Sequence, residues 1–149
     1  MKKLLTAFIV FLLLMTSCED DDYCEDPTTP RLIIGFYDVE NPTLKKPLVI
    51  YAWSDGKDSI YHQVLTDSIL LPLNTNNTIT KYRLATTNIV DTLDLTYTTF
   101  DLFGSEACGF ITQFNDFGVD ELTTKWIQNI EVNVTKIEDE TKAHIKIYH

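Results

Sequence analysis

The chain has 149 residues, of which 44% are hydrophobic, and a formal net charge of −10 at pH 7. This length fits a single domain large enough to bury a core. The strong negative charge argues against nucleic acid as a partner, because the phosphate backbone repels an acidic surface.

Residues 1–17 have the pattern of a bacterial lipoprotein signal peptide. Lys2 and Lys3 give a cationic start, and residues 4–15 form a low-polarity stretch that is too short for a membrane-spanning helix. Small residues then precede Cys18 as in a lipobox, although Met15 stands where leucine is usual. We predict a cleaved signal helix that is not part of the fold, and acylation of Cys18. The alternative is an ordinary secretory signal followed by an incidental cysteine.

Four acidic residues follow the predicted lipid site, namely Glu19, Asp20, Asp21 and Asp22. Such a tract stays solvated, so residues 18–29 are predicted to form a lipidated acidic tether. Its placement resembles the export signal that follows the lipidated cysteine in surface lipoproteins of the Bacteroidota. We therefore expect a lipid-anchored outer-membrane protein, with the cell surface slightly favoured over a periplasm-facing anchor.

Two further cysteines remain, Cys24 and Cys108. An even pair in an oxidising compartment predicts a disulfide. It closes a loop of about 85 residues, which corresponds to roughly 4.5 kcal/mol in the chain-entropy model. The alternative is a catalytic thiol at Cys108, but its neighbours in sequence include no basic residue that would activate it.

Residues 30–149 are predicted to form one β domain. Short runs of branched and aromatic residues alternate with turn signals, and one short helical turn is expected within residues 118–124. Pro72 predicts an edge strand, because proline cannot donate to a β-ladder. The pattern favours an all-β, single antiparallel β-sandwich, immunoglobulin-like or similar, with a small β-barrel as the alternative. The expected strands are residues 30–38, 47–53, 68–73, 78–85, 90–100 and 108–114, with a terminal hairpin of 126–137 and 142–148.

Alternation within the expected strands assigns side chains to faces. Leu93, Leu95 and Tyr97 lie on one face, and Asp94 is expected on the other. His144 falls on the polar face of the last strand and is expected to be solvated. The histidines lack metal-ligand spacing, and the acidic clusters lack the spacing of a calcium loop, so no metal and no cofactor is predicted.

Two aromatic residues, Tyr51 and Trp53, share one face of an expected strand because they lie two positions apart. Sugar rings stack on exposed aromatic side chains, so this pair is a candidate glycan platform. The alternative is a place in the core, since a sandwich needs aromatic residues of about this number.

A motif of an acid, a hydroxyl residue and an aliphatic residue occurs three times, with Ser59, Ser68 and Thr92 at its centre. It resembles the acceptor motif for O-linked glycans on exported Bacteroidota proteins. The alternative is a turn followed directly by the start of a strand.

Several segments of the sequence form a recognisable combination, namely the lipobox, Tyr23-Cys24, residues 28–30, residues 34–38, residues 68–73, Ala107-Cys108-Gly109-Phe110 and residues 144–148. Together they resemble a domain-of-unknown-function family of small lipoproteins from flavobacteria and related Bacteroidota. The resemblance covers the mature chain and implies no catalytic residues, but it supports the lipid anchor and the pairing of the two cysteines.

The sequence contains no serine-hydrolase elbow, phosphate-binding glycine loop or zinc-binding helix motif. We therefore expect a non-enzymatic binding or accessory module at the outer membrane, held there by its lipid. Its partner would be an envelope protein or a glycan. The alternatives are a glycan-binding module proper, using Tyr51 and Trp53, and an enzyme using Cys108 or an acidic pair assembled by the fold.

Overall fold

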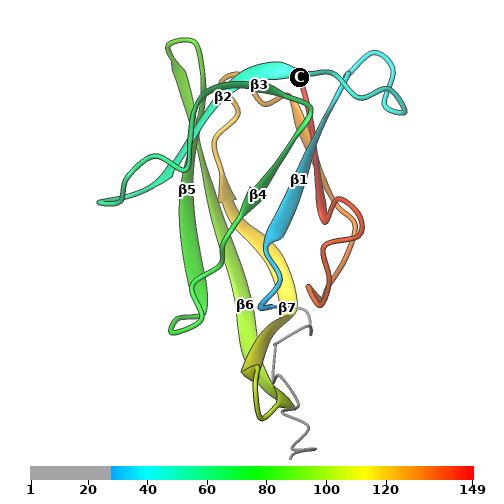
Figure 1. Ribbon diagram of the computed structural model, residues 1–149. Helices are drawn as coiled ribbons and strands as arrows, with labels where there is room; N and C mark the ends of the chain where they lie inside the picture. The colour runs from blue at the N-terminus through cyan, green and yellow to red at the C-terminus, as the bar shows by residue number, and fades with distance from the viewer. Residues whose placement is uncertain (1–27) are drawn as a thin grey trace, which may run out of the picture.

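The computed structural model describes residues 28–149, so the predicted signal peptide and most of the predicted tether lie outside the described residues. The described part is all β, with strands joined by turns and loops (Figure 1). In chain order the strands are β1 (Leu32–Tyr37), β2 (Leu48–Ser54), β3 (Tyr61–Thr66), β4 (Ser68–Leu71), β5 (Ile79–Thr86), β6 (Ile89–Ser105), β7 (Gly109–Leu122), β8 (Asn129–Val132) and β9 (Ile145–Tyr148).

The strands form two sheets that do not close into a barrel. Sheet A has the order β4-β1-β9-β8, and sheet B has the order β3-β2-β5-β6-β7. The predicted β-sandwich is therefore confirmed. Its strand order differs from the ABED and CFG sheets of an immunoglobulin constant domain, because β1 lies between β4 and β9.

One strand pair departs from the antiparallel arrangement that we expected. β1 and β9 run parallel, with Ile34 opposite Ile145 and Phe36 opposite Ile147. These strands come from the two ends of the domain, so no tight hairpin forces them to be antiparallel. The terminal pair β8 and β9 is antiparallel, as predicted.

The core lies between the sheets and follows the period-2 alternation of the strands. Leu93, Leu95 and Tyr97 point inward from β6, as predicted. Trp126, in the loop before β8, is also buried, and its indole N–H donates to the carbonyl of Leu84 at 3.0 Å. Trp126 is therefore not one of the aromatic residues exposed on the surface.

Several segments differ from the sequence prediction. β6 continues to Ser105, beyond the expected residue 100, and β8 spans only Asn129–Val132 of the expected 126–137. Residues 61–66 form β3, although no strand was expected there, and β7 continues to Leu122 where a helical turn was expected. β3 contains a register shift opposite Ile50 and Ala52, and Gln63 has a φ of 56°. Such a bulge breaks the alternation that identifies a strand. The end of β7 is held by pairing with β6, at Leu93 opposite Leu122.

A long hairpin extends beyond the sandwich. β6 and β7 continue past the neighbouring strands, and residues 98–113, named the arm from here on, project at the bottom of Figure 1. The described chain begins near the base of this arm, where the Thr112 N–H donates to Thr29 Oγ1 at 3.1 Å. β4 is an edge strand of sheet A, as the position of Pro72 predicted.

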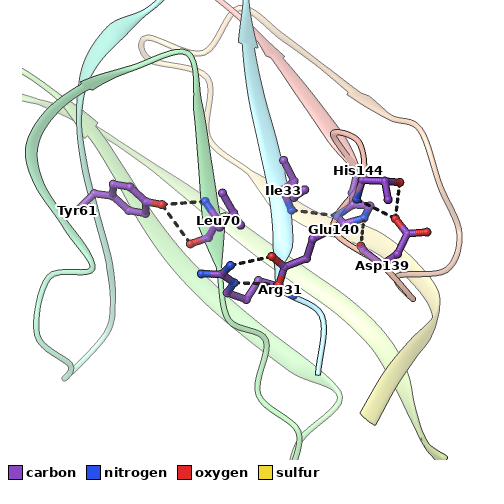
Figure 2. A network of polar contacts seen from close by, with 8 residues as sticks. Arg31, Ile33, Tyr61, Leu70, Asp139, Glu140 and His144 are labelled. Atoms are coloured by element: carbon purple, nitrogen blue, oxygen red, sulfur yellow. Dashed lines mark hydrogen bonds and ion pairs between the residues drawn. The ribbon is translucent and has the colours of Figure 1, made fainter. Parts of the chain in front are cut away.

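A polar network fixes the start of the domain to the loop before β9 (Figure 2). The Arg31 guanidinium donates to both carboxylate oxygens of Glu140, Nε to Oε1 at 2.9 Å and Nη2 to Oε2 at 2.7 Å. The Arg31 N–H also donates to Glu140 Oε1, at 2.8 Å. Such a bidentate pair fixes the orientation of both groups. The first strand therefore starts from a defined position.

His144 lies in the same network and is buried, so the expectation of a solvated histidine is wrong. Its Nδ1 accepts from the Ile33 N–H at 2.9 Å, and its Nε2 lies 3.0 Å from the carbonyl of Asp139 (Figure 2). The residue precedes β9, so strand alternation does not decide its exposure. The loop that carries Asp139 contacts the ring instead.

Candidate functional site

The outer face of sheet B carries the predicted aromatic pair. Ile50 and Ala52 of β2 are buried in the core, so Tyr51 and Trp53 between and after them project from the opposite face and are half-exposed. The His62 ring lies against Tyr51 in an edge-on arrangement, with centroids 5.3 Å apart. The structure thus brings Tyr51 and Trp53 together on one surface, named here the Trp53 face.

A fixed ion pair borders Trp53. β5 places Arg83 directly opposite Trp53, and the guanidinium bonds Asp55 through Nε to Oδ1 at 3.0 Å and Nη2 to Oδ2 at 3.1 Å. Arg83 also donates to the Thr92 hydroxyl on β6. The hydrogen bond to Arg83 lowers the pKa of Asp55, and the same bond raises the pKa of Arg83. Both groups are therefore charged at neutral pH.

A cleft of about 730 Å³ adjoins this ion pair, between the turn after β2 and the loop before β5. We name it the β2–β5 cleft. Its wall combines charged, amide and hydroxyl groups with apolar side chains. Among the lining residues are Asp55, Lys57, Lys81, Asn74, Asn76, Thr80, Tyr82, Ile60 and Ile79. The cleft therefore offers many hydrogen-bond donors and acceptors within a small volume.

Lys81 connects the cleft to a buried carboxylate. Its ammonium group pairs with Asp94 Oδ2, and this hydrogen bond raises the pKa of Lys81. Asp94 lies opposite Lys81 in the register of β5 and β6 and is only 2% exposed. Its other oxygen, Oδ1, has no hydrogen-bond partner within residues 28–149. The Lys81 side chain lies against this carboxylate. The alternation of residues within one strand does not reveal such a contact between two strands.

Two titratable groups of the cleft, Tyr82 and Asp55, have pKa values that are shifted away from neutral pH. Burial raises the pKa of Tyr82, whose hydroxyl donates to the carbonyl of Pro72. Asp55, by contrast, has a lowered pKa. General acid–base catalysis works best with a pKa near the operating pH, and these two groups are shifted away from it. The arrangement is suited to holding a polar ligand.

The three predicted O-glycosylation residues lie apart from one another. Ser59 is exposed in the turn before β3, where its hydroxyl donates to the carbonyl of Tyr61 at 2.6 Å. Ser68 is half-buried at the start of β4, and Thr92 is half-buried inside sheet B beneath Arg83. Modification at these residues stays a prediction, and exposure favours Ser59.

Of the remaining predicted site residues, Cys108 lies in the described part of the chain and the others precede it. Cys108 lies in the turn at the tip of the arm, and its N–H donates to Ser105 Oγ at 3.1 Å. Cys18, Cys24 and the acidic residues Glu19, Asp20, Asp21 and Asp22 lie outside the described residues. Acylation and the disulfide therefore stay predictions.

Sequence reasoning missed the polar partners of Trp53. The alternation of residues 78–85 places Lys81 and Arg83 on one face, but it does not indicate which strand lies beside them. Only the register of β2 against β5 puts Arg83 next to Trp53. Across residues 28–149, no group of three His, Cys, Asp or Glu side chains is arranged to bind a metal ion. The same residues contain no helix with the length and apolarity needed to cross a membrane.

Comparison with protein families adds a classification. Residues 47–149 match DUF6452, a family of unknown function. The chain belongs to the DUF6452 family. The match begins just before β2 and runs to the last residue, so it includes the Trp53 face, the cleft and the arm. Membership of a domain-of-unknown-function family was predicted and is confirmed. No curated protein and no solved structure shows significant similarity to this DUF6452 protein.

Proposed function

We propose that this DUF6452 protein is a non-enzymatic binding module, anchored by lipid at the outer membrane, that binds a glycan on the Trp53 face and in the β2–β5 cleft. The observation that carries the proposal is the position of Trp53. Its ring is half-exposed and lies across from Arg83 of β5. Asp55, the ion-pair partner of Arg83, lines a cleft of about 730 Å³ that has both polar and apolar walls.

The chemistry of this surface fits a polyhydroxylated ligand. A sugar ring has an apolar face that stacks on an aromatic ring, and hydroxyl groups that need donors and acceptors at its edge. Trp53 supplies the first, and the side chains of Asp55, Lys57, Asn74 and Asn76 supply the second. Because the chain has a formal charge of −10, a neutral or basic glycan fits better than an acidic one.

The anchor rests on the signal peptide pattern and Cys18. Several acyl chains hold a protein durably, since each buried methylene contributes about 0.8 kcal/mol. The acidic tract after Cys18 supports export to the cell surface in a member of the Bacteroidota, with a periplasm-facing anchor as the alternative. An envelope protein is the alternative partner to a glycan.

The position of Thr29 supports the proposed disulfide. Thr29 contacts the arm at Thr112, four residues from Cys108, and Cys24 lies five residues before Thr29. Extended, the four-residue segment spans at most roughly 14 Å and the five-residue segment at most roughly 18 Å. The two cysteines are therefore within reach of each other.

The proposed ligand site is tested by titrating the mature protein with a panel of neutral oligosaccharides while recording tryptophan fluorescence. Binding quenches the Trp53 emission, whereas the buried Trp126 is unaffected. Replacing Trp53→Ala should weaken binding by at least about tenfold, or about 1.4 kcal/mol. It should hardly change stability, because the side chain lies outside the core.

The matched control is Val132→Ala, which changes another exposed apolar residue on sheet A. It should bind like the wild type. If no oligosaccharide in the panel quenches the emission, or if Trp53→Ala binds as well as the wild type, the Trp53 face is not the ligand site.

A further inference from the structure

The arm exposes an unusual amount of aromatic surface. Phe100 is 51% exposed, Phe103 61% and Phe110 71%. The rings of Phe103 and Phe110 pack edge to face across the two strands, with centroids 5.6 Å apart. Soluble proteins rarely expose contiguous apolar surface of this kind unless it contacts something.

The apolar residues lie on both faces of the arm. Phe103 is opposite Phe110 in the register of β6 and β7, and Leu102 is opposite Ile111. Neighbouring residues of a strand point to opposite faces, so these two pairs lie on opposite sides of the ribbon. A flat protein partner covers one side only. A medium that surrounds the ribbon, such as the interfacial region of a bilayer, covers both.

The chain leads from the proposed lipid site to this arm. The contact of Thr29 with Thr112 and the Arg31–Glu140 pair fix the first described residues near the base of the arm. Ten residues separate Cys18 from Thr28, so the base lies within roughly 35 Å of the acylated residue. The proposed disulfide joins Cys24 to Cys108 at the tip of the arm. Cys24 is six residues after Cys18, which is a span of at most roughly 20 Å.

We infer that the arm is a membrane-contacting element, which inserts Phe100, Phe103 and Phe110 into the interfacial region of the bilayer that holds the lipid anchor. The inference rests on the proposed anchor. Residues 98–113 contain Asp101 and Glu106 but no lysine or arginine. The arm is therefore suited to zwitterionic head groups, because anionic lipids attract basic segments. Contact at two points, lipid and arm, sets the orientation of the sandwich on the membrane.

The test uses the mature lipidated protein in vesicles of zwitterionic phosphatidylcholine with brominated acyl chains, which quench nearby tryptophan. In a Trp53→Phe background, Trp126 remains as a buried reference. Phe103→Trp and, separately, Phe110→Trp add an emitter on the arm. Leu65→Trp adds the matched control on β3, where the native side chain is 70% exposed. The added emission from either arm variant should fall by at least about twofold, and that from the control should not change.

Three results would overturn the inference, and flotation with the vesicles separates them. If the protein floats but neither arm variant is quenched more than the control, the anchor holds and the arm contact is wrong. If the protein does not float and mass spectrometry finds Cys18 without lipid, the anchor fails and the arm contact fails with it. If the arm emission shifts to the blue without lipid and in proportion to protein concentration, the arm binds a second copy of the chain.

Discussion

At the residue scale, Asp91 stabilises a loop that its sequence position does not suggest. The carboxylate is fully buried and accepts from the Thr123 hydroxyl at 2.7 Å and from the N–H groups of Lys125, Trp126 and Ile127 at 2.8–3.1 Å. Burial alone would raise the pKa of Asp91. The hydrogen bonds that the carboxylate accepts, above all the one from the Ile127 N–H, outweigh the effect of burial. They hold the pKa of Asp91 below its ordinary value.

Replacing Asp91→Ala leaves buried N–H groups without an acceptor. We expect the free energy of unfolding to fall by about 3–5 kcal/mol, the range found when one partner of a buried charged interaction is removed. Urea denaturation followed by tryptophan fluorescence measures the change. Asp58→Ala, in an exposed turn, is the control and should stay within about 0.5 kcal/mol of the wild type. Equal stability of the two variants would contradict this account of Asp91.

His144 makes stability depend on pH. Burial lowers the pKa of its imidazole, and the ordinary value is about 6.5. Between the lowered folded value and about 6.5, the unfolded chain binds more protons than the folded chain. The contribution of His144 to stability is therefore complete above about pH 6.5 and is lost as the pH falls toward the folded value.

We expect the free energy of unfolding to decrease from pH 7.5 to pH 5.5, and His144→Gln to show a smaller decrease. The glutamine can still accept from the Ile33 N–H but does not titrate. Urea denaturation at both pH values measures this difference. His62→Gln, on the exposed side of β3, is the control and should keep the wild-type pH dependence. The same decrease in His144→Gln as in the wild type would assign the effect to other groups.

At the scale of elements, β3 shows how side chains join the two sheets. Tyr61 lies at the start of β3 in sheet B, and its hydroxyl accepts from the Leu70 N–H of β4 at 3.0 Å (Figure 2). The phenol group of Tyr61 therefore helps to connect the two sheets at their edges. Sequence alternation missed β3 because the bulge near Gln63 interrupts it.

The proposed disulfide acts at the same scale, because it fastens the tether to the arm. Removing it with Cys108→Ala should lower the free energy of unfolding by up to roughly 4.5 kcal/mol. Cys24→Ala should cost the same amount, and the double variant should cost no more than either, since each change removes the same bond. Mass spectrometry of unreduced peptides identifies the bond directly. Additive losses, or a peptide map without the Cys24–Cys108 link, would rule it out.

At the scale of the whole molecule, the two ends of the domain meet. β1 and β9 pair in the middle of sheet A, and Arg31 contacts Glu140 beside them. The segment after β8 then pairs with β7 of sheet B, where the Ile137 N–H donates to the Phe114 carbonyl at 2.8 Å. Sheet A is therefore complete only when the last residues are in place.

The sequence by itself determined the fold class, most of the strands and the edge position of β4. These features follow from local causes, which are the alternation of apolar residues, turn residues and the missing N–H of Pro72. It also indicated that Tyr51 and Trp53 share a face, since two-residue spacing alone decides that.

Only the tertiary structure decided which residues stand beside Trp53, why His144 and Asp94 are buried, and that β1 pairs in parallel with β9. Each of these depends on contacts between residues far apart in the chain, and no local pattern encodes strand register or partner. The same holds for the arm. The sequence predicts a strand that ends at residue 100 and another that begins at residue 108, and the exposure of the arm becomes visible only when β6 and β7 extend past every neighbouring strand.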